Sequence, residues 1–346
     1  MPENAAKPSI TVLYDAQEES VRTEEIAEGK KKVPPLICDQ IATVLTKRGY
    51  EVKSLAAEAP VKKLVRKLEE DTSDIVFNVC ESLGGAPDEE RRIAALLELL
   101  EKRFTGSGSL AMTMAGDKSL ANKLFDFHGI RSPDFTVIAP GGRVEGNPSL
   151  SKFPLIVKPS SMDASIGIDA RSVVHTVGEV VERVLAIHNE FHVPALVEQY
   201  IDGREIYVSL LGNPPDVLPP IEWDLSKLPP ELPRIAGTEA KWEHDFKEAK
   251  EFVPQDVIED EQVMQRIREA ALGAWNALLI RDYARIDMRL TPDGTPYVIE
   301  VNPNPWLDSG AEFAMAARGA KLTHADVIER IVQLAMRHPI RERSAI

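Results

Sequence analysis

The chain has 346 residues, 43% hydrophobic and 28% charged, a composition typical of globular proteins and a length sufficient for two or three domains. Its formal net charge of −14 argues against nucleic acid as the main partner, because phosphate contacts need concentrated Lys and Arg. No apolar run approaches the roughly 20 residues of a membrane span, and the N-terminus lacks the apolar core of a signal peptide. The two cysteines, Cys38 and Cys80, are too few for a disulfide framework or a cysteine-based zinc site. We therefore expect a cytoplasmic protein without a membrane partner.

Strand-like runs alternate with helical periodicity in the N-terminal part of the chain. The predicted strands cover residues 9–15 and 74–79, and apolar residues recur at helical spacing in residues 36–50, 60–70 and 91–103. This alternation predicts an α/β domain with a parallel sheet over residues 1–105. The charge-rich segment 16–33 is expected to be a mobile loop of that domain.

Two further domains are predicted, over residues 106–202 and 203–346. The second has predicted helices at 117–130 and 176–188 and predicted strands at 153–159 and 195–201. The third has a predicted strand at 204–212, a proline-rich loop at 213–238, a long helix at 260–279, a hairpin, and a helix at 323–338 that starts with the capping pair Thr323 and Asp326.

The hairpin "YARIDMRLTPDGTPYVIEVNPNP" of residues 283–305 has strict apolar/polar alternation on both sides of the turn signal "PDG". Strand side chains alternate between faces. One face is predicted to carry Arg285, Asp287, Glu300 and Asn302, and the other Ala284, Ile286, Met288, Ile299 and Val301. Grouped hard oxygen ligands suit Mg²⁺, and the neighbouring arginine would stabilise developing negative charge. A solvated sheet face is the alternative.

Two other segments are candidates for a ligand site. In "IVKPSSMDASIGI", residues 156–168, a strand ends near Lys158, and a loop of small residues follows that can bring backbone amides close to phosphate oxygens. In "ALVEQYIDGREIYV", residues 195–208, Glu198 and Glu205 flank a joint between two strands, where they can accept hydrogen bonds from a ribose or an adenine edge. A surface turn with one lysine and an inter-strand turn with exposed acids are the respective alternatives.

The order of these residues along the chain is more specific than any one motif. The series comprises Lys118, Lys158, Glu198, Glu205, Lys241, Asp287, Glu300 and Asn302. It resembles the ATP-grasp ligases and, within them, the D-alanine–D-alanine ligase family. The resemblance covers nearly the whole chain and includes "FNVCESLGG", "GIRSPDFTVI" and "EVNPNP". It implies a three-domain ATP-grasp architecture with the nucleotide between two antiparallel sheets.

The resemblance also implies a role for each residue of the series. Lys118 and Lys158 would hold the nucleotide phosphates, Glu198 with Gln199, Tyr200 and Ile201 would line the adenine, and Glu205 would bind the ribose hydroxyls. Lys241 would reach the terminal phosphate from a closing loop, predicted over residues 235–253. Asp287, Glu300 and Asn302 would bind Mg²⁺, with Mn²⁺ as an alternative, and Arg285 would face the tetrahedral intermediate. The implied chemistry is phosphorylation of a carboxylate by ATP, followed by attack of an amine on the acyl phosphate.

The departures from the family lie on the substrate side. The first strand is followed by "AQEESVRTEE" without the family's glycines, and Glu18, Glu19 and Glu24 are alternatives for its substrate-anchoring glutamate. Glu81 stands in place of a histidine, and Ala164 in place of the catalytic serine, while Ser165 keeps the next serine and is the catalytic candidate. Trp242 replaces a tyrosine, and Trp306 replaces a glycine whose amide contributes to an oxyanion hole.

These departures predict a ligase whose substrates differ from D-alanine. An acidic wall that includes Glu81 should attract an ammonium group and repel a second carboxylate. The expected substrates are therefore an amino acid or amine and a carboxylate, with Glu81 and Trp306 as candidate substrate contacts. Two alternatives remain, a true D-alanine–D-alanine ligase of cell-wall synthesis and a nucleotide-binding homologue without turnover. The resemblance also implies a homodimer.

Overall fold

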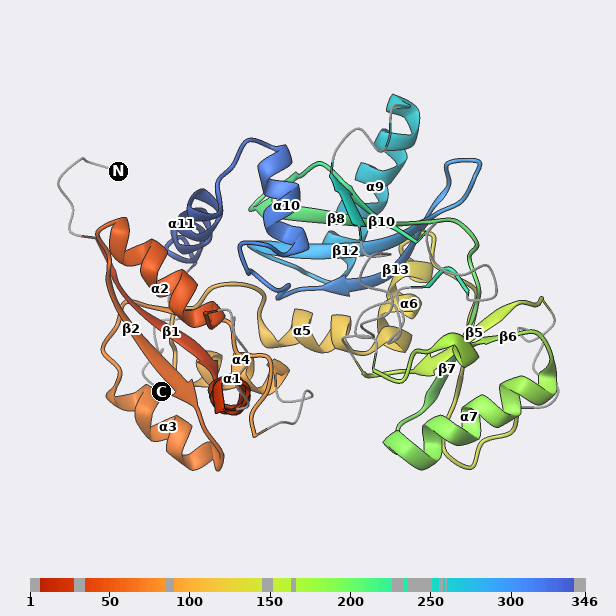
Figure 1. The fold of residues 1–346 in the computed structure, drawn as a ribbon, viewed down its shortest axis with the longest axis horizontal. Helices are drawn as coiled ribbons and strands as arrows, with labels where there is room; N and C mark the ends of the chain where they lie inside the picture. Colours follow the sequence, from red (N-terminus) through yellow and green to blue (C-terminus); the bar gives the residue numbers. More distant parts are fainter. Residues whose placement is uncertain are drawn as a thin grey trace, which may run out of the picture.

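A computed structural model of the chain describes residues 7–27, 35–84, 90–144, 152–162, 166–225, 233–235, 251–254, 258 and 260–338. Within these ranges the strands form one parallel sheet and two antiparallel sheets, each packed with helices (Figure 1). The predicted mixed α/β architecture with two antiparallel sheets is confirmed. The domain boundaries predicted at residues 105 and 202 stay a prediction.

The N-terminal sheet is parallel and has the strand order β2-β1-β3. Its strands are β1 (Ser9–Asp15), β2 (Glu51–Ala57) and β3 (Ile75–Asn78), and its helices are α2 (Ile37–Lys47), α3 (Val61–Glu70) and α4 (Glu90–Leu99). Successive side chains of a strand enter opposite cores. Val12 packs with α2 residues such as Ile41, whereas Leu13 packs with α3 and α4 residues such as Leu64. The sheet is therefore covered on both faces, as parallel sheets require.

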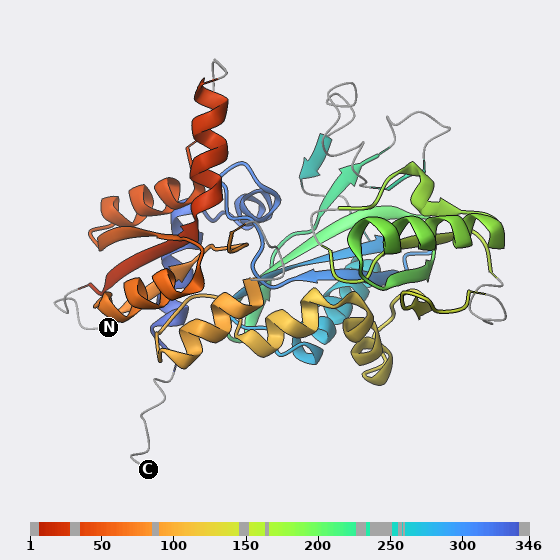
Figure 2. The same ribbon diagram turned by 90° about the horizontal axis from the view of Figure 1, so that it is seen from below.

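The prediction of a loop over residues 16–33 is wrong for its described part. Residues Ala16–Ala27 form α1, which continues directly from β1 and projects away from the sheet (Figure 2). Asp15 accepts a hydrogen bond from the backbone N–H of Gln17 at 2.9 Å, and two glutamates in the first turn complement the helix dipole. Because Ala, Gln, Glu and Arg favour helix, this charge-rich segment forms a helix. Residues 28–33 lie outside the described ranges.

The middle part of the chain contains two helices followed by a four-stranded antiparallel sheet. Helices α5 (Ser109–Gly116) and α6 (Lys118–Phe127) precede the sheet, whose strand order is β4-β7-β5-β6. Its strands are β4 (Phe135–Ile138), β5 (Leu155–Pro159), β6 (Val173–Val174) and β7 (Ala195–Gln199). Helix α7 (Val177–Phe191) covers one face of this sheet through Val180, Val184 and Ile187, which leaves the other face available for a ligand.

The third sheet is antiparallel and has the order β11-β10-β8-β12-β13, with β9 paired to β8. Its strands are β8 (Arg204–Gly212), β9 (Pro215–Val217), β10 (Ile221–Asp224), β11 (Glu251–Pro254), β12 (Tyr283–Leu290) and β13 (Pro296–Asn302). Helices α5, α6 and α9 (Glu261–Ala277) lie along one face of it (Figure 2). The opposite face is the one that meets the four-stranded sheet.

The predicted loop over residues 213–238 is also wrong in part, because β9 and β10 lie within it. Ile221 and Trp223 alternate with polar residues and are buried, and they pair with Tyr207 and Glu205 of β8. The prolines at 219 and 220 precede the paired residues, so they do not interrupt the ladder. Residues 226–232 and 236–238 are not among the described residues.

The hairpin of β12 and β13 has the predicted polar face with one correction. Arg285 pairs with Asn302 and Asp287 with Glu300, but the register then shifts and Met288 pairs with Val298. This β-bulge removes Ile299 from the regular alternation. Val298 and Val301 enter the hydrophobic core, whereas Ile299 faces the cavity described below.

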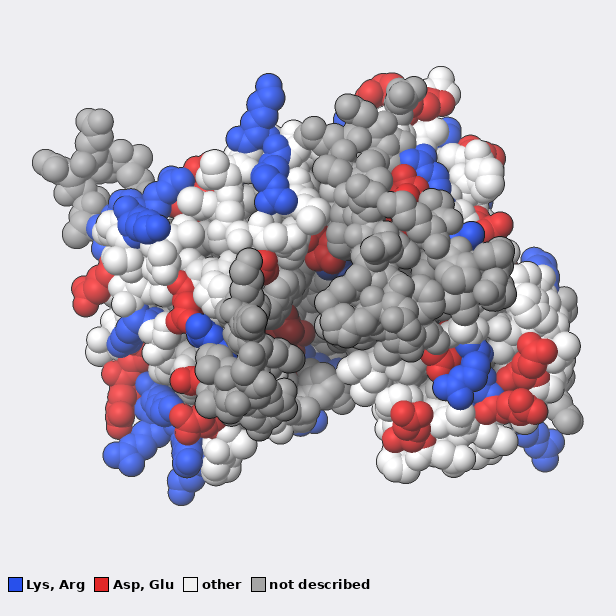
Figure 3. Space-filling view, in the orientation of Figure 1, with Lys and Arg blue, Asp and Glu red and all other residues white. Residues whose placement is uncertain are grey.

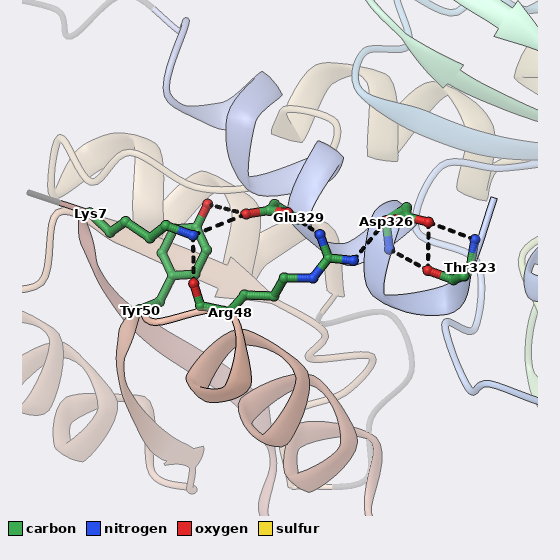
Figure 4. A network of polar contacts seen from close by, with 6 residues as sticks. All are labelled: Lys7, Arg48, Tyr50, Thr323, Asp326 and Glu329. Carbon is green, nitrogen blue, oxygen red and sulfur yellow. Dashed lines mark hydrogen bonds and ion pairs between the residues drawn. The ribbon is translucent and has the colours of Figure 1, made fainter. Parts of the chain in front are cut away.

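The C-terminal helices return to the N-terminal sheet. Helix α10 (Glu312–Gly319) is followed by α11 (His324–Ala335), which begins with the predicted capping box between Thr323 and Asp326. On α11, Glu329 accepts hydrogen bonds from Arg48 at 2.5 Å, Lys7 at 3.2 Å and the Tyr50 hydroxyl at 3.2 Å (Figure 4). Arg48 also contacts Asp326 at 2.7 Å. These ion pairs connect the first and last parts of the chain.

On the molecular face in Figure 3, Lys and Arg side chains of the described residues lie among Asp and Glu side chains instead of forming one basic patch. None of the helices in the described ranges has the length and apolar character that a membrane span requires.

Candidate active site

A cavity that is open to solvent lies between the four-stranded and six-stranded sheets. The residues that line it are Lys118, Pro133, Ile156, Lys158, Ile168, Glu198, Gln199, Tyr200, Ile201, Glu205, Tyr207, Ile235, Asp287, Met288, Arg289, Ile299 and Glu300. Nine of these belong to the predicted site. The apolar part of the wall suits a planar base, and the charged part suits phosphates and a cation.

Each of the two lysines in the cavity is paired with a carboxylate. Lys118, the first residue of α6, contacts Glu300 Oε1 of β13 at 2.7 Å and donates to the carbonyl oxygen of Met162 at 2.7 Å. Lys158 of β5 contacts Glu198 Oε2 of β7 at 2.6 Å. The exposed fractions of Lys158 and Glu198 are only 3% and 2%. Because buried charges are costly unless paired, these ion pairs hold both lysines at the cavity wall.

The Lys158–Glu198 pair has a second support. The other carboxylate oxygen of Glu198 accepts a hydrogen bond from Asn122 Nδ2 of α6 at 2.7 Å. In the ladder Lys158 is opposite Leu196 and Glu198 is opposite Ile156, so the two charged side chains are diagonal neighbours on the same face. Glu198 is therefore fixed by two polar contacts. It lies in the cavity wall beside Gln199, Tyr200 and Ile201, the residues predicted with it to line the adenine.

The polar face of the hairpin centres on Asp287. Arg285 donates to both oxygens of Asp287, at 2.7 and 2.9 Å, and Asn302 Nδ2 donates to Oδ2 at 3.2 Å. The second guanidinium edge of Arg285 lies 3.6 Å from Glu312 at the start of α10. Burial lowers the pKa of Arg285, but the charge of Asp287 and the hydrogen bonds to it outweigh burial, so the pKa is raised above its ordinary value. Arg285 stays cationic at any working pH.

Glu205 of β8 lies on the same sheet face as Asp287, on the neighbouring strand, and is held by two contacts. Its Oε1 accepts a hydrogen bond from the Tyr207 hydroxyl at 2.9 Å, and its Oε2 lies 3.3 Å from Arg289 Nη2 of β12. Burial and the nearby charges of Glu205 and Asp287 raise the pKa of Tyr207 well above its ordinary value, so its hydroxyl remains a donor.

The donor set of the hairpin fits a hard divalent cation. Asp287 and Glu300 are direct partners in the β12–β13 ladder, where like charges repel each other. Arg285 offsets the charge of Asp287, and Lys118 offsets that of Glu300. Two carboxylates and one amide oxygen provide only oxygen ligands, which is the chemistry Mg²⁺ and Mn²⁺ select. Among the residues that the structure describes, no group of three or more His, Cys, Asp or Glu is arranged to hold a metal, so a nitrogen- or sulfur-based metal centre is not found there.

Not every predicted site residue reaches the cavity. Ser165 and Lys241 lie outside the described ranges, as do Ala164, Trp242 and most of the predicted closing loop. Glu81 is exposed just after β3 and does not line the cavity. Trp306 follows β13, is 39% exposed and does not line it either.

Glu81 is nevertheless part of an acidic group beside the N-terminal sheet. Burial, followed by the charges of Glu81 and Asp15, raises the pKa of Glu18 to about 7. Glu19 instead accepts a hydrogen bond from the Tyr14 hydroxyl at 3.0 Å. Of the three glutamates considered for substrate anchoring, Glu18 is therefore the one placed beside Glu81, while the side chain of Glu24 is not described.

Several cavity residues were missed by the sequence analysis, above all Tyr207 and Arg289. Both stand two positions from a predicted residue in the same strand, Tyr207 after Glu205 and Arg289 after Asp287. Period-2 alternation places such residues on the same face, so this signal was present. Period-2 alternation could not predict that Ile299 lines the cavity, because its position depends on the bulge.

Comparison with known proteins identifies the family. The family model described as "D-ala D-ala ligase C-terminus" matches residues 124–333. The chain is 30% identical to a D-alanine–D-alanine ligase of Pelotomaculum thermopropionicum, over 79% of this chain and 83% of the relative. It belongs to the D-alanine–D-alanine ligase-like family of ATP-grasp proteins. It is also 32% identical, over 87% of this chain and 88% of the relative, to the uncharacterized protein y4sG of Sinorhizobium fredii.

Solved structures of ATP-grasp proteins share the fold of this family member. A D-alanine–D-alanine ligase of Bacillus anthracis in complex with ATP has a TM-score of 0.70 and 21% identity, over 96% of this chain and 98% of that one. The enzyme of Coxiella burnetii gives a TM-score of 0.70 at 20% identity, over 96% and 94% of the two chains. The predicted ATP-grasp fold is confirmed.

Proposed function

We propose that this family member is an ATP-dependent carboxylate–amine ligase that binds ATP in the cavity between its two antiparallel sheets. The observation that supports this most is the convergence of nine predicted residues on one cavity, although they are distributed from α6 to β13. The activity for which its relatives are named, D-alanine–D-alanine ligation, belongs to the same reaction class.

We propose a task for each charged or polar group at this site. Lys118 and Lys158 neutralise phosphate charge, and Glu205 accepts hydrogen bonds from the ribose. Asp287, Glu300 and Asn302 would hold Mg²⁺, which would neutralise charge on the transferred phosphoryl group. Lys118 and Glu300 are paired with each other at 2.7 Å. Lys118 would leave this pair to contact a phosphate, and Glu300 would then be available to the metal.

The reaction has two steps. A carboxylate oxygen of the first substrate bonds to the terminal phosphorus of ATP, and the bond to the bridging oxygen breaks with release of ADP. The amine nitrogen of the second substrate then bonds to the acyl carbon, loses a proton, and phosphate leaves. Arg285, held by Asp287 and Glu312, stabilises the oxyanion of this second step.

We further propose that the amine substrate differs from D-alanine. Glu18 and Glu81 form an acidic group beside the N-terminal sheet, and Glu312 adds a further carboxylate 3.6 Å from Arg285. These acids favour a substrate with an additional ammonium group and oppose a second carboxylate. A true D-alanine–D-alanine ligase and a nucleotide-binding protein without turnover are the alternatives.

The test is an ADP-release screen of the purified protein against D- and L-amino acids and diamines, singly and in pairs with carboxylates, at saturating Mg-ATP. We expect turnover with a pair that includes a cationic amine. Strong turnover with D-alanine alone, giving the dipeptide, would refute the substrate proposal. Tight Mg-ATP binding without any turnover would support the binding protein instead. A homodimer and a cytoplasmic location stay predictions.

A further inference from the structure

Tyr207 lies at the centre of the cavity face of the six-stranded sheet. It is almost fully buried and is opposite Asp287 in the β8–β12 ladder. On its own strand the preceding residue of the same face is Glu205. The rings of Tyr207 and Trp223 of β10 pack in a T shape, with 6.2 Å between centroids and 74° between planes. Tyr207 therefore stands between the proposed ribose end of the site and the proposed metal end.

The hydroxyl of Tyr207 fixes the carboxylate of Glu205. It donates to Oε1 at 2.9 Å, while Arg289 contacts Oε2 at 3.3 Å. Arg289 is in turn fixed by donation to the carbonyl oxygen of Gly203 at 2.9 Å. A carboxylate contacted from both sides keeps one orientation, and a fixed acceptor loses less conformational entropy when a ligand hydroxyl binds to it.

The ring of Tyr207 contacts the other end of the site. The guanidinium carbon of Arg285 lies 4.7 Å from the ring centroid, within the range of a cation–π interaction. Asp287 contacts one edge of the same guanidinium and Glu312 the other. The guanidinium of Arg285 is therefore contacted on its edges by Asp287 and Glu312 and by the ring of Tyr207.

We propose that Tyr207 is a positioning residue that orients the nucleotide acceptor Glu205 through its hydroxyl and the catalytic Arg285 through its ring. This rests on the proposed ligase function. The hydroxyl and the ring of Tyr207 would then affect two different measurable quantities. The hydroxyl sets nucleotide affinity, and the ring sets the rate of the chemical step.

The hydroxyl is tested with Tyr207→Phe, which keeps the ring. Isothermal titration should show that the variant binds Mg-ATP about tenfold more weakly than the wild type, which is the lower end of the loss expected for a hydrogen bond to a charged group. Binding of 2′,3′-dideoxy-ATP, which lacks both ribose hydroxyls, should be equal in the two proteins. Tyr50→Phe is the matched control, because it removes a tyrosine–glutamate hydrogen bond of 3.2 Å that lies outside the cavity. It should leave ATP affinity unchanged.

A double-mutant cycle with Glu205→Ala separates positioning from a direct effect. If Tyr207 acts through Glu205, then Tyr207→Phe should cause no further loss of ATP affinity in the Glu205→Ala background. Additive losses, or an equal loss for ATP and 2′,3′-dideoxy-ATP, would overturn the proposed role of the hydroxyl.

The ring is tested by comparing Tyr207→Leu with Tyr207→Phe at saturating ATP, after thermal unfolding has shown that both variants are folded. We expect kcat to fall about tenfold further in the leucine variant, because only that variant removes the aromatic face beneath Arg285. Equal kcat values would overturn the role of the ring. If the leucine variant does not fold, Tyr207→Trp replaces it, because tryptophan retains an aromatic face without the phenol. We expect kcat of this variant to fall by a smaller factor than its ATP affinity. A larger fall in kcat than in ATP affinity would overturn the proposal.

These outcomes are distinct from failure of the proposed function. A wild-type protein that binds no Mg-ATP would refute the ATP site itself. A wild-type protein that binds Mg-ATP, with Tyr207→Phe binding it equally well, would refute only the positioning role.

Discussion

Lys118 and Glu300 form an ion pair at 2.7 Å, although one begins α6 and the other lies on β13 of the six-stranded sheet. Glu300 is also the ladder partner of Asp287, so the lysine offsets one of two adjacent negative charges. The two acids and Lys118 therefore form one electrostatic unit. Any ligand that separates Lys118 from Glu300 must supply both an anion for the lysine and a cation for the acids, which a metal–nucleotide complex does.

The first prediction concerns this unit. Glu300→Gln should lower ADP release at limiting Mg²⁺ by about 100-fold, since loss of metal-borne charge stabilisation costs several kcal/mol of activation free energy. Asp287→Asn should act in the same way, and thermal unfolding should show both variants folded. The matched control is Glu222→Gln, which disrupts the surface pair with Arg204 on the same sheet. Turnover like that of the wild type in either variant would remove the metal assignment.

The second prediction separates the two sides of the bulge in β13. Val298→Ala should reduce the free energy of unfolding by about 2 kcal/mol, because Val298 is fully buried in the core. Ile299→Ala should leave stability nearly unchanged but weaken Mg-ATP binding, because Ile299 lines the cavity. Urea unfolding and isothermal titration of both variants measure the two effects. A strongly destabilising Ile299→Ala with unchanged binding would contradict the bulged register.

The third prediction concerns Glu18, whose pKa is raised from its ordinary value to about 7 by burial and by the charges of Glu81 and Asp15. A carboxyl group with a raised pKa binds more protons in the folded state, so its contribution to stability falls as pH rises from about 4.5 to about 7. Glu18→Gln should remove this fall, and Glu81→Gln should reduce it.

Urea unfolding at several pH values between 4.5 and 8 measures the Glu18 effect. Glu69→Gln, an exposed substitution on α3, serves as the control and should follow the wild-type curve. An unchanged pH dependence in Glu18→Gln would show that Glu18 is not the titrating group.

The fourth prediction concerns the ion pairs between α11 and the N-terminal sheet (Figure 4). Hydrogen bonds from Thr323 and Arg48 lower the pKa of Asp326 to about 2. Hydrogen bonds and charges from Lys7, Tyr50 and Arg48 outweigh burial, which by itself raises the pKa, and lower the pKa of Glu329. Groups with lowered pKa values stabilise the fold above their unfolded pKa, and this contribution is lost as pH falls.

Thermal unfolding should therefore show a loss of stability between about pH 4.5 and pH 2 that is smaller in Glu329→Gln. At pH 7 this variant should unfold about 2 °C below the wild type. The control is Glu70→Gln, which disrupts an exposed pair with Arg66 on α3 and should behave like the wild type. An equal acid dependence in Glu329→Gln would assign that loss to other carboxylates.

The sequence by itself determined the local elements and the order of the charged residues. Helical spacing and capping signals predicted α2, α3, α7 and α11, including the capping box of Thr323 and Asp326. Alternation around "PDG" predicted the hairpin and placed Asp287 and Glu300 on one face. These features follow from periodicities of 3.6 and 2 residues, which depend only on near neighbours in the chain.

Tertiary structure decided which charges meet and where the periodicity fails. No local pattern specifies that Lys118 pairs with Glu300 and Lys158 with Glu198, because each pair requires the sheets and α6 to pack first. The bulge that turns Ile299 into the cavity depends on pairing with β12. The strand over Ile221–Asp224 replaced part of a predicted loop, because a place beside β8 outweighed the loop signal of proline. The helix over Ala16–Ala27, by contrast, follows from local helix propensity that the prediction of a charged loop overlooked.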